Sequence, residues 1–313
     1  MKKNSKIVCL GGGNGMPHAV LPSLKKYPVK ISVISATLDT GSSAGRLRQG
    51  FKTGISFGDI RRAALALSEA DVKTKSEFAY RDWDGHVMAN VFCTAIMAAT
   101  GSQEAAVQGL KTKLKVPEKH EILPVTLDDA NICAVLENGQ TIVGETNIDV
   151  PKHNGNLKIK EVYLEPKAKA YSKALKAIEE ADVITIGPGD LYSSLAQILL
   201  VEGIPQAFKK SKAKKVYICN LMQKHGETDH FMVQDFVAQI EKLLGSHLDF
   251  VIYNKTKPDT QRMVSHKKEH PELLDMVENR TSDQRFIEAD LITSSGPIAH
   301  DPDKLAKIIL SLT

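Results

Sequence analysis

The sequence predicts an α/β fold in which a doubly wound, mostly parallel, Rossmann-like sheet carries a small antiparallel β insertion. Three observations predict this class. Short apolar runs alternate with helical patterns over most of the chain, the first apolar run ends in a glycine-rich turn that opens a helix, and a middle stretch changes to closely spaced alternating segments. The chain of 313 residues is long enough to bury a sizeable core.

The first part of the chain predicts strands followed by loops and helices. In order, these are a strand at 6–10 (KIVCL), a helix after GGGNG, a strand at 29–39 (VKISVISATLD) and helices at 59–70, about 86–100 and 102–112. Pro22 is expected to shorten or kink the first helix, because proline lacks the N–H of a helix interior. Gly101 is expected to separate the last two helices.

Residues 119–166 interrupt this pattern. EILPVTL, ICAVLENGQTIVGET and LKIKEVYLEP are short alternating segments, and Asn138-Gly139 predicts a two-residue hairpin turn. We therefore expect a small β-rich insertion at 119–166. Residues 1–118 and 167–313 would form the Rossmann-like domain.

Alternation resumes in the last part of the chain. The expected strands are DVITI, KKVYICN and DFVIYN, and the expected helices are YSKALKAIEEA, LYSSLAQILLVEG, HFMVQDFVAQIEKLL and DKLAKIILSL. Residues 256–285 are polar enough to form a long, partly helical excursion.

Composition excludes several classes of protein. The net charge is +4, and the lysine-rich segments are scattered rather than gathered on one element, which argues against nucleic-acid binding. No run approaches the roughly 18 apolar residues of a membrane span, and the start of the chain is too short in apolar residues for a signal peptide. The four cysteines lack C-x-x-C spacing, which is typical of core thiols in a reducing compartment. We therefore expect a cytoplasmic protein with no membrane or nucleic-acid partner.

Polar and glycine-rich loops follow the predicted strands. In an open α/β sheet, ligands bind beyond the carboxyl ends of the strands, so these loops are the candidate site. The loops are GGGNG at 11–15, DTGSSAGRLR at 39–48, GPGDLYSS at 187–194, QKHGET at 223–228 and Asn254-Lys255. A glycine turn before a helix can hold a phosphate on free N–H groups, although it can equally exist to let the helix pack close to its strand.

Other nucleotide signatures are incomplete. The dinucleotide fingerprint requires glycine at its sixth position, where this chain has Met16. A nicotinamide-dependent dehydrogenase therefore keeps only the first glycine turn and Asp39 in its favour. Neither G-x-x-x-x-G-K-[ST] nor G-x-S-x-G occurs, so P-loop hydrolysis and serine-esterase chemistry lack their signatures.

Two carboxylates are candidate metal ligands. Asp39 follows the second predicted strand, and Asp59 begins a predicted helix in SFGDIR. Carboxylates beside phosphate-binding hydroxyls and guanidinium groups suit a magnesium–diphosphate complex. The alternatives are a turn or cap residue for Asp39 and a helix N-cap for Asp59.

Taken in order, GGGNG, LDTGSSAGRLR, GDIRR, GHVMAN, GPGDLYSS, NLMQKHGET and HDPDKLA resemble the CofD/YvcK family. This family includes 2-phospho-L-lactate transferase and the bacterial gluconeogenesis factor. The resemblance runs from Gly11 to Leu305, and GSSAGRLR, GDIR and HDPDKLA are more similar to the gluconeogenesis-factor branch.

The resemblance implies a ligand in which a nucleoside diphosphate is linked to another group, with Mg²⁺ as the cofactor and a homodimer as the assembly. Asp39 and Asp59 would hold the metal. The residues that would contact phosphate or nucleotide are Gly12, Gly13, Asn14, Gly15, Ser42, Ser43, Arg46, Asn90, Gly187, Gly189, Ser193, Ser194, Asn220, Gln223 and Thr228.

Two functions follow from the resemblance. A gluconeogenesis-factor-like regulator would bind a UDP-sugar such as UDP-N-acetylglucosamine and present a surface to a protein partner. A transferase would pass a phospho-acyl group to a deazaflavin hydroxyl and release GMP. Leu38 stands where related proteins have a second carboxylate, Thr40 and Ala89 replace glycines, and aromatic residues are only 5% of the chain. These departures favour the regulator, because Mg²⁺ would meet less negative charge and a deazaflavin ring would find few stacking partners.

Overall fold

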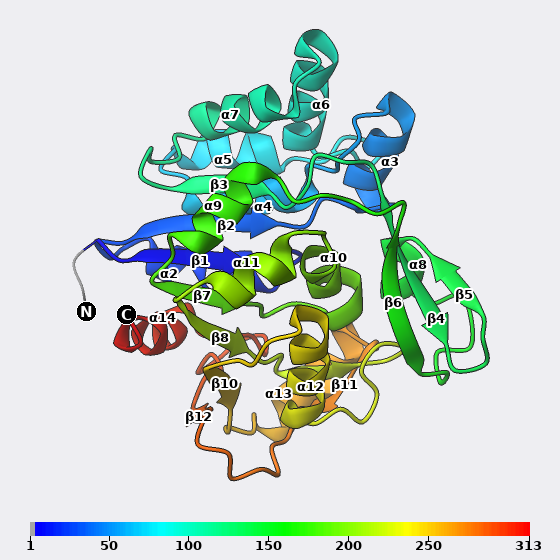
Figure 1. Ribbon diagram of the computed structural model, residues 1–313, viewed down its shortest axis with the longest axis vertical. Coiled ribbons are helices and arrows are strands. Elements are labelled where there is room, and N and C mark those ends of the chain that lie inside the picture. The colour runs from blue at the N-terminus through cyan, green and yellow to red at the C-terminus, as the bar shows by residue number, and fades with distance from the viewer. Residues whose placement is uncertain (1–3) are drawn as a thin grey trace.

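A seven-stranded parallel sheet forms the centre of the protein, as the sequence predicts (Figure 1). The computed structural model describes residues 4–313. The strand order is β12-β10-β8-β7-β1-β2-β3, and every neighbouring pair is parallel. The strands are β1 Lys6–Leu10, β2 Lys30–Ser35, β3 Glu121–Pro124, β7 Val183–Ile186, β8 Lys214–Ile218, β10 Phe250–Asn254 and β12 Phe286–Ala289. β12 was not predicted, because its half-exposed FIEA lacks a long apolar run.

The strand order reverses between β1 and β7. The chain moves outward from β1 to β2 and β3, returns to pair β7 with the other side of β1, and then continues to β8, β10 and β12. The carboxyl ends of β1 and β7 lie at the same edge, because Leu10 pairs with Ile186. Their loops diverge there, at the topological switch point where α/β sheets bind ligands.

Both faces of the sheet are covered. Along β1, Ile7 and Cys9 belong to one apolar core, whereas Val8 and Leu10 belong to another. Successive side chains of a strand point to opposite faces, so the two cores lie on the two sides of the sheet. This explains why the central strands are nearly continuous apolar runs.

The helices follow the predicted pattern except for those at 42–51, 72–79, 145–149 and 204–210, which were not predicted, and the first of these occupies part of the expected DTGSSAGRLR loop. They are α1 Met16–Ala19, α2 Leu21–Leu24, α3 Ser42–Phe51, α4 Gly58–Leu67, α5 Val72–Ala79, α6 Met88–Thr100, α7 Gln103–Lys113, α8 Glu145–Asp149, α9 Ser172–Glu179, η1 Leu191–Leu195 (a π-helical turn), α10 Ala196–Leu199, α11 Ile204–Lys210, α12 Val233–Leu244, α13 Thr260–Glu269 and α14 Pro302–Ser311. The first helix is broken into α1 and α2 just before Pro22, and Gly101 ends α6 with φ +67°. Within residues 4–313, each helix is too short or too polar to cross a bilayer.

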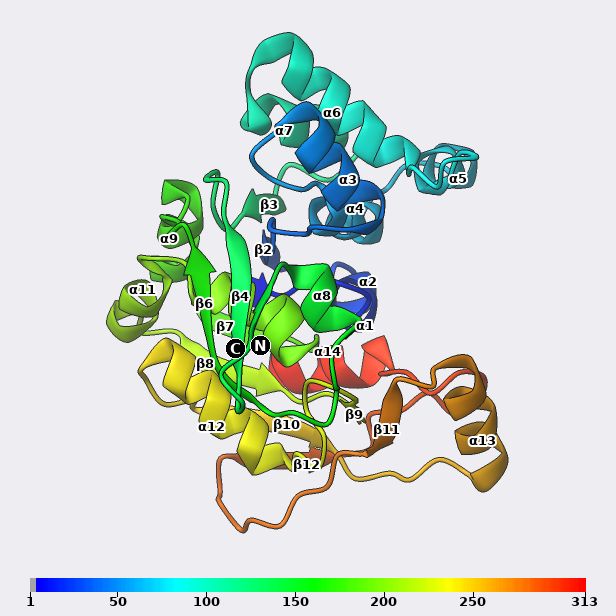
Figure 2. The same cartoon turned by 90° about the vertical axis from the view of Figure 1, so that its right-hand side faces the viewer.

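A separate three-stranded antiparallel sheet, β5-β4-β6, lies beside the central sheet (Figure 2). Its strands are β4 Asn131–Leu136, β5 Thr141–Val143 and β6 Ile159–Glu165. The range 119–166 also contains β3, which pairs with β2 in the central sheet, because its buried residues continue that core. The hairpin loop has three residues rather than two. Gly139 alone takes positive φ there, and Leu136 N donates to Gln140 O.

A third, two-stranded sheet pairs β9 Met222–Lys224 with β11 Leu273–Met276. It lies within a region where the sequence predicted only loops and a polar excursion. Neither strand is long enough to show a clear alternation.

Candidate functional site

A cavity of about 1020 Å³ opens at the switch point, and we call it the switch-point cavity. Loops after β1, β2, β7 and β8 contribute to its wall, together with α8 and the β9–β11 sheet. The lining residues used below are Gly12, Gly13, Asn14, Gly15, His18, Asp39, Ser42, Asp59, Arg62, Glu145, Thr146, Asp149, Gly189, Asp190, Ser194, Asn220, Lys224, Glu272 and His300.

The two glycine-rich loops approach each other closely. A Cβ atom on Gly15 would lie 2.3 Å from the carbonyl oxygen of Pro188, so only glycine fits at this position. Asn220 extends the contact, because its Oδ1 accepts a hydrogen bond from Gly189 N at 3.0 Å. The loops after β1, β7 and β8 therefore form one continuous wall.

Asp59 fixes the first glycine loop. Its Oδ1 accepts hydrogen bonds from Gly13 N and from Arg62 Nη1, each at 2.8 Å. The carboxylate is 3% exposed and lies in the first turn of α4. Asp59 is therefore not the N-cap, and its side chain points at the loop instead.

Asp39 and Glu145 are half-buried carboxyl groups on the same cavity wall. Burial, and then the charge of Asp59, raise the pKa of Asp39 to about 7. Burial, and then the charge of Asp39, raise the pKa of Glu145 to about 8. The three carboxylates repel one another, and a bound cation would lower both pKa values. Leu38, which stands where related proteins have a second carboxylate, is wholly buried in the core. Glu145 instead adds a further acid to the cavity wall.

Thr40 joins this loop to α8. Its Oγ1 accepts a hydrogen bond from Thr146 N at 3.1 Å, and its own φ is not positive. The strained position lies two residues later, at Ser42 with φ +52°. The loop therefore tolerates threonine at residue 40, and Gly41 leaves no room for a Cβ against Thr146.

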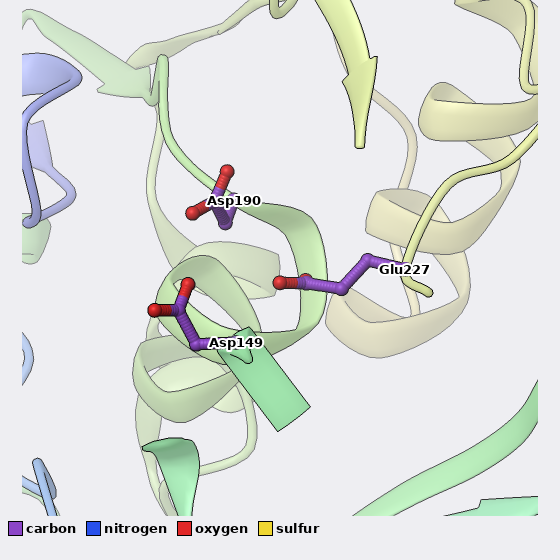
Figure 3. Close-up of side chains that lie close together, drawn as sticks. All are labelled: Asp149, Asp190 and Glu227. Carbon is purple, nitrogen blue, oxygen red and sulfur yellow. The ribbon is translucent and has the colours of Figure 1, made fainter. Parts of the chain in front are cut away.

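A lysine lies among three further carboxylates on the far side of the cavity. Asp149, Asp190 and Glu227 offer oxygen atoms within 4.8 Å of one another, and their side chains converge (Figure 3). Lys224 Nζ forms ion pairs with Asp149, with Asp190 at 2.8 Å and with Glu227 at 3.1 Å. Burial opposes the charge of Lys224, but the three acids together raise its pKa. The ammonium group is thus the cation of this cluster.

The predicted site residues fall into four groups. Those that line the switch-point cavity are Gly12, Gly13, Asn14, Gly15, Asp39, Ser42, Asp59, Gly189, Ser194 and Asn220. Gly187, Ser193 and Thr228 lie behind its wall; Ser193 Oγ donates to Glu227 Oε1 at 2.7 Å, and Thr228 Oγ1 accepts from Lys224 N at 2.9 Å. Gln223 instead lines a separate hollow near α13.

Ser43, Arg46 and Asn90 lie together at the beginning of α6. Ser43 Oγ accepts hydrogen bonds from Val87 N at 2.9 Å and from Asn90 Nδ2 at 3.0 Å. Arg46 Nη2 donates to the carbonyl oxygen of Asp84. These three residues do not line the switch-point cavity.

Sequence reasoning did not identify Arg62, Glu145, Asp190 or Lys224 as site residues. Arg62, Asp190 and Lys224 lie inside motifs that were recognised, so their charge next to a candidate ligand was an available signal. Glu145 belongs to α8, which follows the β4–β5 hairpin. No pattern in the sequence indicates that this hairpin lies beside the glycine loops.

Asp39, Asp59 and Glu145 could contribute ligands to a hydrated magnesium ion, although among the described residues the carboxylates whose oxygens lie within 4.8 Å of one another are Asp149, Asp190 and Glu227. Asp39, Asp59 and Glu145 give carboxylate oxygens to one cavity, and its volume leaves room for the waters that Mg²⁺ retains. Burial and the neighbouring acids raise the pKa of Asp39 and of Glu145, although the charges of Arg62 and Arg48 oppose the shift at Asp39. The Lys224 cluster does not fit, because an ammonium group already lies among its oxygens.

Comparisons with known proteins match this architecture. The family model of 2-phospho-L-lactate transferase CofD matches residues 7–292. A putative gluconeogenesis factor of Nostoc sp. is 36% identical over 319 residues, covering 98% of this chain and 68% of the relative. One of Thermotoga maritima is 35% identical over 315 residues, covering 97% and 98%. The crystal structure of a UPF0052-family protein of Bacillus halodurans has a TM-score of 0.91 at 30% identity, covering 99% and 100%. The chain therefore belongs to the CofD family, within which it is similar to proteins named gluconeogenesis factor.

Proposed function

We propose that the protein binds a nucleoside diphosphate linked to a sugar, such as UDP-N-acetylglucosamine, and acts as a gluconeogenesis-factor-like regulator of carbon flux and cell-wall synthesis. The observation that carries the proposal is the cavity of about 1020 Å³ between the Gly12–Gly15 and Pro188–Asp190 loops. It lies at the switch point of the sheet, where α/β proteins hold nucleotides. Its volume lies at the upper end of the roughly 300–1,000 Å³ of typical small-molecule pockets, which leaves room for a ligand of several linked groups.

The charge of the cavity indicates how a diphosphate would bind. Six carboxyl groups line the cavity, whereas Arg62 and Lys224 are its cations apart from histidines. The acids are Asp39, Asp59, Glu145, Asp149, Asp190 and Glu272. A diphosphate alone would be repelled, so we propose that it enters as a magnesium complex at Asp39 and Asp59. Magnesium dependence is then expected of a regulator as well as of a transferase.

A transferase of the 2-phospho-L-lactate type is the second candidate. The family model of 2-phospho-L-lactate transferase CofD, which matches residues 7–292, favours it. The relatives named gluconeogenesis factor favour the regulator. Release of GMP from a lactyl-diphospho-guanosine donor with a deazaflavin acceptor would decide for the transferase.

The test is a thermal-shift panel with UDP-N-acetylglucosamine, GDP, GMP and NADH, each with Mg²⁺ or with EDTA. A ligand that binds only the folded protein raises the melting temperature. We expect a rise with UDP-N-acetylglucosamine in Mg²⁺ and a smaller rise in EDTA, and we expect Asp39→Asn to remove the difference. If no nucleoside diphosphate raises the melting temperature in either condition, the proposal is wrong.

A further inference from the structure

Two arginines, the buried Arg48 and the half-buried Arg61, differ in their hydrogen bonds. Arg48 is 5% exposed and donates to Gly54 O at 3.0 Å and Asp39 O at 3.2 Å, and also to Asp129 and to Ala130 O. Arg61, on α4, has a buried Nε with no acceptor, and its guanidinium forms no hydrogen bond or ion pair with any residue in 4–313. The guanidinium of Arg48 therefore has acceptors within the fold, whereas that of Arg61 has N–H donors without an acceptor among the described residues.

The surroundings of Arg61 leave further polar atoms unpaired. α4 packs against α6, and Arg61 lies near enough to Cys93 on α6 for its charge to act on that thiol. On the same side of α6, Asn90 Oδ1 and Thr94 Oγ1 are buried without a partner, in residues only 2% and 4% exposed. His86 Nδ1, just before α6, is also buried without a partner. Unpaired buried polar atoms are uncommon in native proteins, so this group calls for an explanation.

Positive charge also accumulates here. Within residues 4–313, none of Arg46, Arg61 and Arg81 forms an ion pair, and the hydrogen bonds of Arg46 and Arg81 go to backbone carbonyl oxygens. The carboxylates of Asp59 and Asp39 lie near enough to act on Arg61, but neither forms an ion pair with it in the described part of the chain. A half-buried arginine beside other arginines is costly unless an anion binds it.

We infer that Arg61, Thr94 and Asn90 form a second binding site, between α4 and the first half of α6, for an oxyanion such as a phosphate or carboxylate group. The fork of N–H donors on arginine matches two oxygens of such a group. The Thr94 hydroxyl can donate to a third oxygen, and Asn90 Oδ1 can accept from a hydroxyl of the ligand. Arg62, the next residue, lines the switch-point cavity, so the two sites adjoin.

The oxyanion can be a free ion or the far end of a ligand held in the switch-point cavity, and the second case rests on the proposed function. Binding of inorganic phosphate, and separately of UDP-N-acetylglucosamine with Mg²⁺, is measured by calorimetry and thermal shift at constant ionic strength. The variants are Arg61→Met, Thr94→Val and Gly15→Ala, the last of which displaces the loops of the switch-point cavity because its Cβ would clash with the backbone of Pro188. Arg48→Met is the matched control for an interior arginine.

A free-ion site predicts that Arg61→Met abolishes the phosphate response, whereas Gly15→Ala retains it. A shared ligand predicts no phosphate response but a loss of roughly tenfold or more in affinity for UDP-N-acetylglucosamine in Arg61→Met. Thr94→Val should weaken whichever response is seen. The inference is overturned if Arg61→Met binds both probes as the natural protein does, or if the natural protein binds neither. If phosphate binds in a way that depends on Arg61 and UDP-N-acetylglucosamine does not bind, the proposed function is contradicted but the second site is not.

Stability supplies an independent readout. Without ligand, Arg61→Met should melt at the same or a higher temperature, because the substitution removes an unpaired charge and keeps the apolar stem. Arg48→Met should melt lower, because it leaves Asp129 and three carbonyl oxygens without their donor. If Arg61→Met instead loses as much stability as Arg48→Met, then Arg61 is a structural residue and the inference fails.

Discussion

Gly13 N donates a hydrogen bond to Asp59 Oδ1 at 2.8 Å, and this bond joins the first glycine loop to the beginning of α4. The same oxygen accepts from Arg62, so a single buried carboxylate positions a backbone loop and a cavity arginine together. The loop can follow this path only because Gly12 has no side chain. A Cβ on Gly12 would lie 1.7 Å from Asp59 Oδ2.

Gly12→Ala should therefore displace Asp59 and abolish ligand binding. We expect a lower melting temperature and no thermal shift with UDP-N-acetylglucosamine and Mg²⁺. Gly50→Ala is the matched control, because a Cβ on Gly50, within α3, meets no atom within 4 Å. That change should stabilise the protein by about 0.5–1 kcal/mol and leave binding intact. Normal binding by Gly12→Ala would contradict the role of the loop.

The acids of the cavity predict how stability depends on pH. Asp39, with a pKa of about 7, and Glu145, with a pKa of about 8, keep protons that the unfolded chain loses near pH 4. Between about pH 4 and 8 the folded state binds more protons than the unfolded state. The free energy of unfolding, without ligand or metal, should therefore fall as the pH rises through this range.

Asp39→Asn isolates this effect. The variant should match the natural protein near pH 4 and exceed its stability at pH 8 by on the order of 2 kcal/mol. Urea unfolding in EDTA at several pH values measures the difference. Added Mg²⁺ at pH 8 should stabilise the natural protein but not Asp39→Asn. A difference that is the same at every pH would mean that Asp39 does not titrate as described.

Lys224 should be essential to the fold around the cavity. Its side chain is 8% exposed and pairs with three acids, so Lys224→Met leaves Asp149, Asp190 and Glu227 without a cation. Breaking a buried pair in this way costs about 3–5 kcal/mol. Lys257→Met is the control, because its ion pair with Glu278 is exposed and should contribute little. Equal unfolding free energies for the two variants would refute this account.

Exposed apolar side chains predict self-association through α3 and α6. Of the nine strongly exposed large apolar residues among those described, six lie within 51–91: Phe51, Val72, Tyr80, Trp83, Met88 and Val91. At about 150–250 Å² per ring, the three aromatics expose on the order of 400 Å², about half of what each partner of a stable interface buries. α6 carries no charged residue, so a second copy of the chain can pack against it without repulsion.

Sedimentation equilibrium tests this homodimer. Val91→Glu on α6 should dissociate it, whereas Val264→Glu, which changes an exposed valine on α13, should not. A protein that is monomeric at every concentration, or a dimer that is equally stable in both variants, would contradict the prediction.

The sequence by itself determined the central sheet and the loops at its edge. Apolar runs of strand length, alternating with helical patterns, specify a parallel sheet because such strands must be buried on both faces. That rule also places the loops after β1, β2, β7 and β8 at one edge. Gly12, Asp39, Asp59 and Asn220 could thus be expected near one another from their positions after strands and at a helix start.

Only the tertiary structure decided which charges meet. Glu145 and Asp149 come from α8, whose position depends on how the β5-β4-β6 sheet packs against the main sheet. Ser43 forms a hydrogen bond with Asn90 on α6 and neither lines the cavity, and of the neighbouring residues Arg61 and Arg62 it is Arg62 that lines the cavity. Such choices depend on contacts between segments far apart in sequence, and local periodicity carries no record of them.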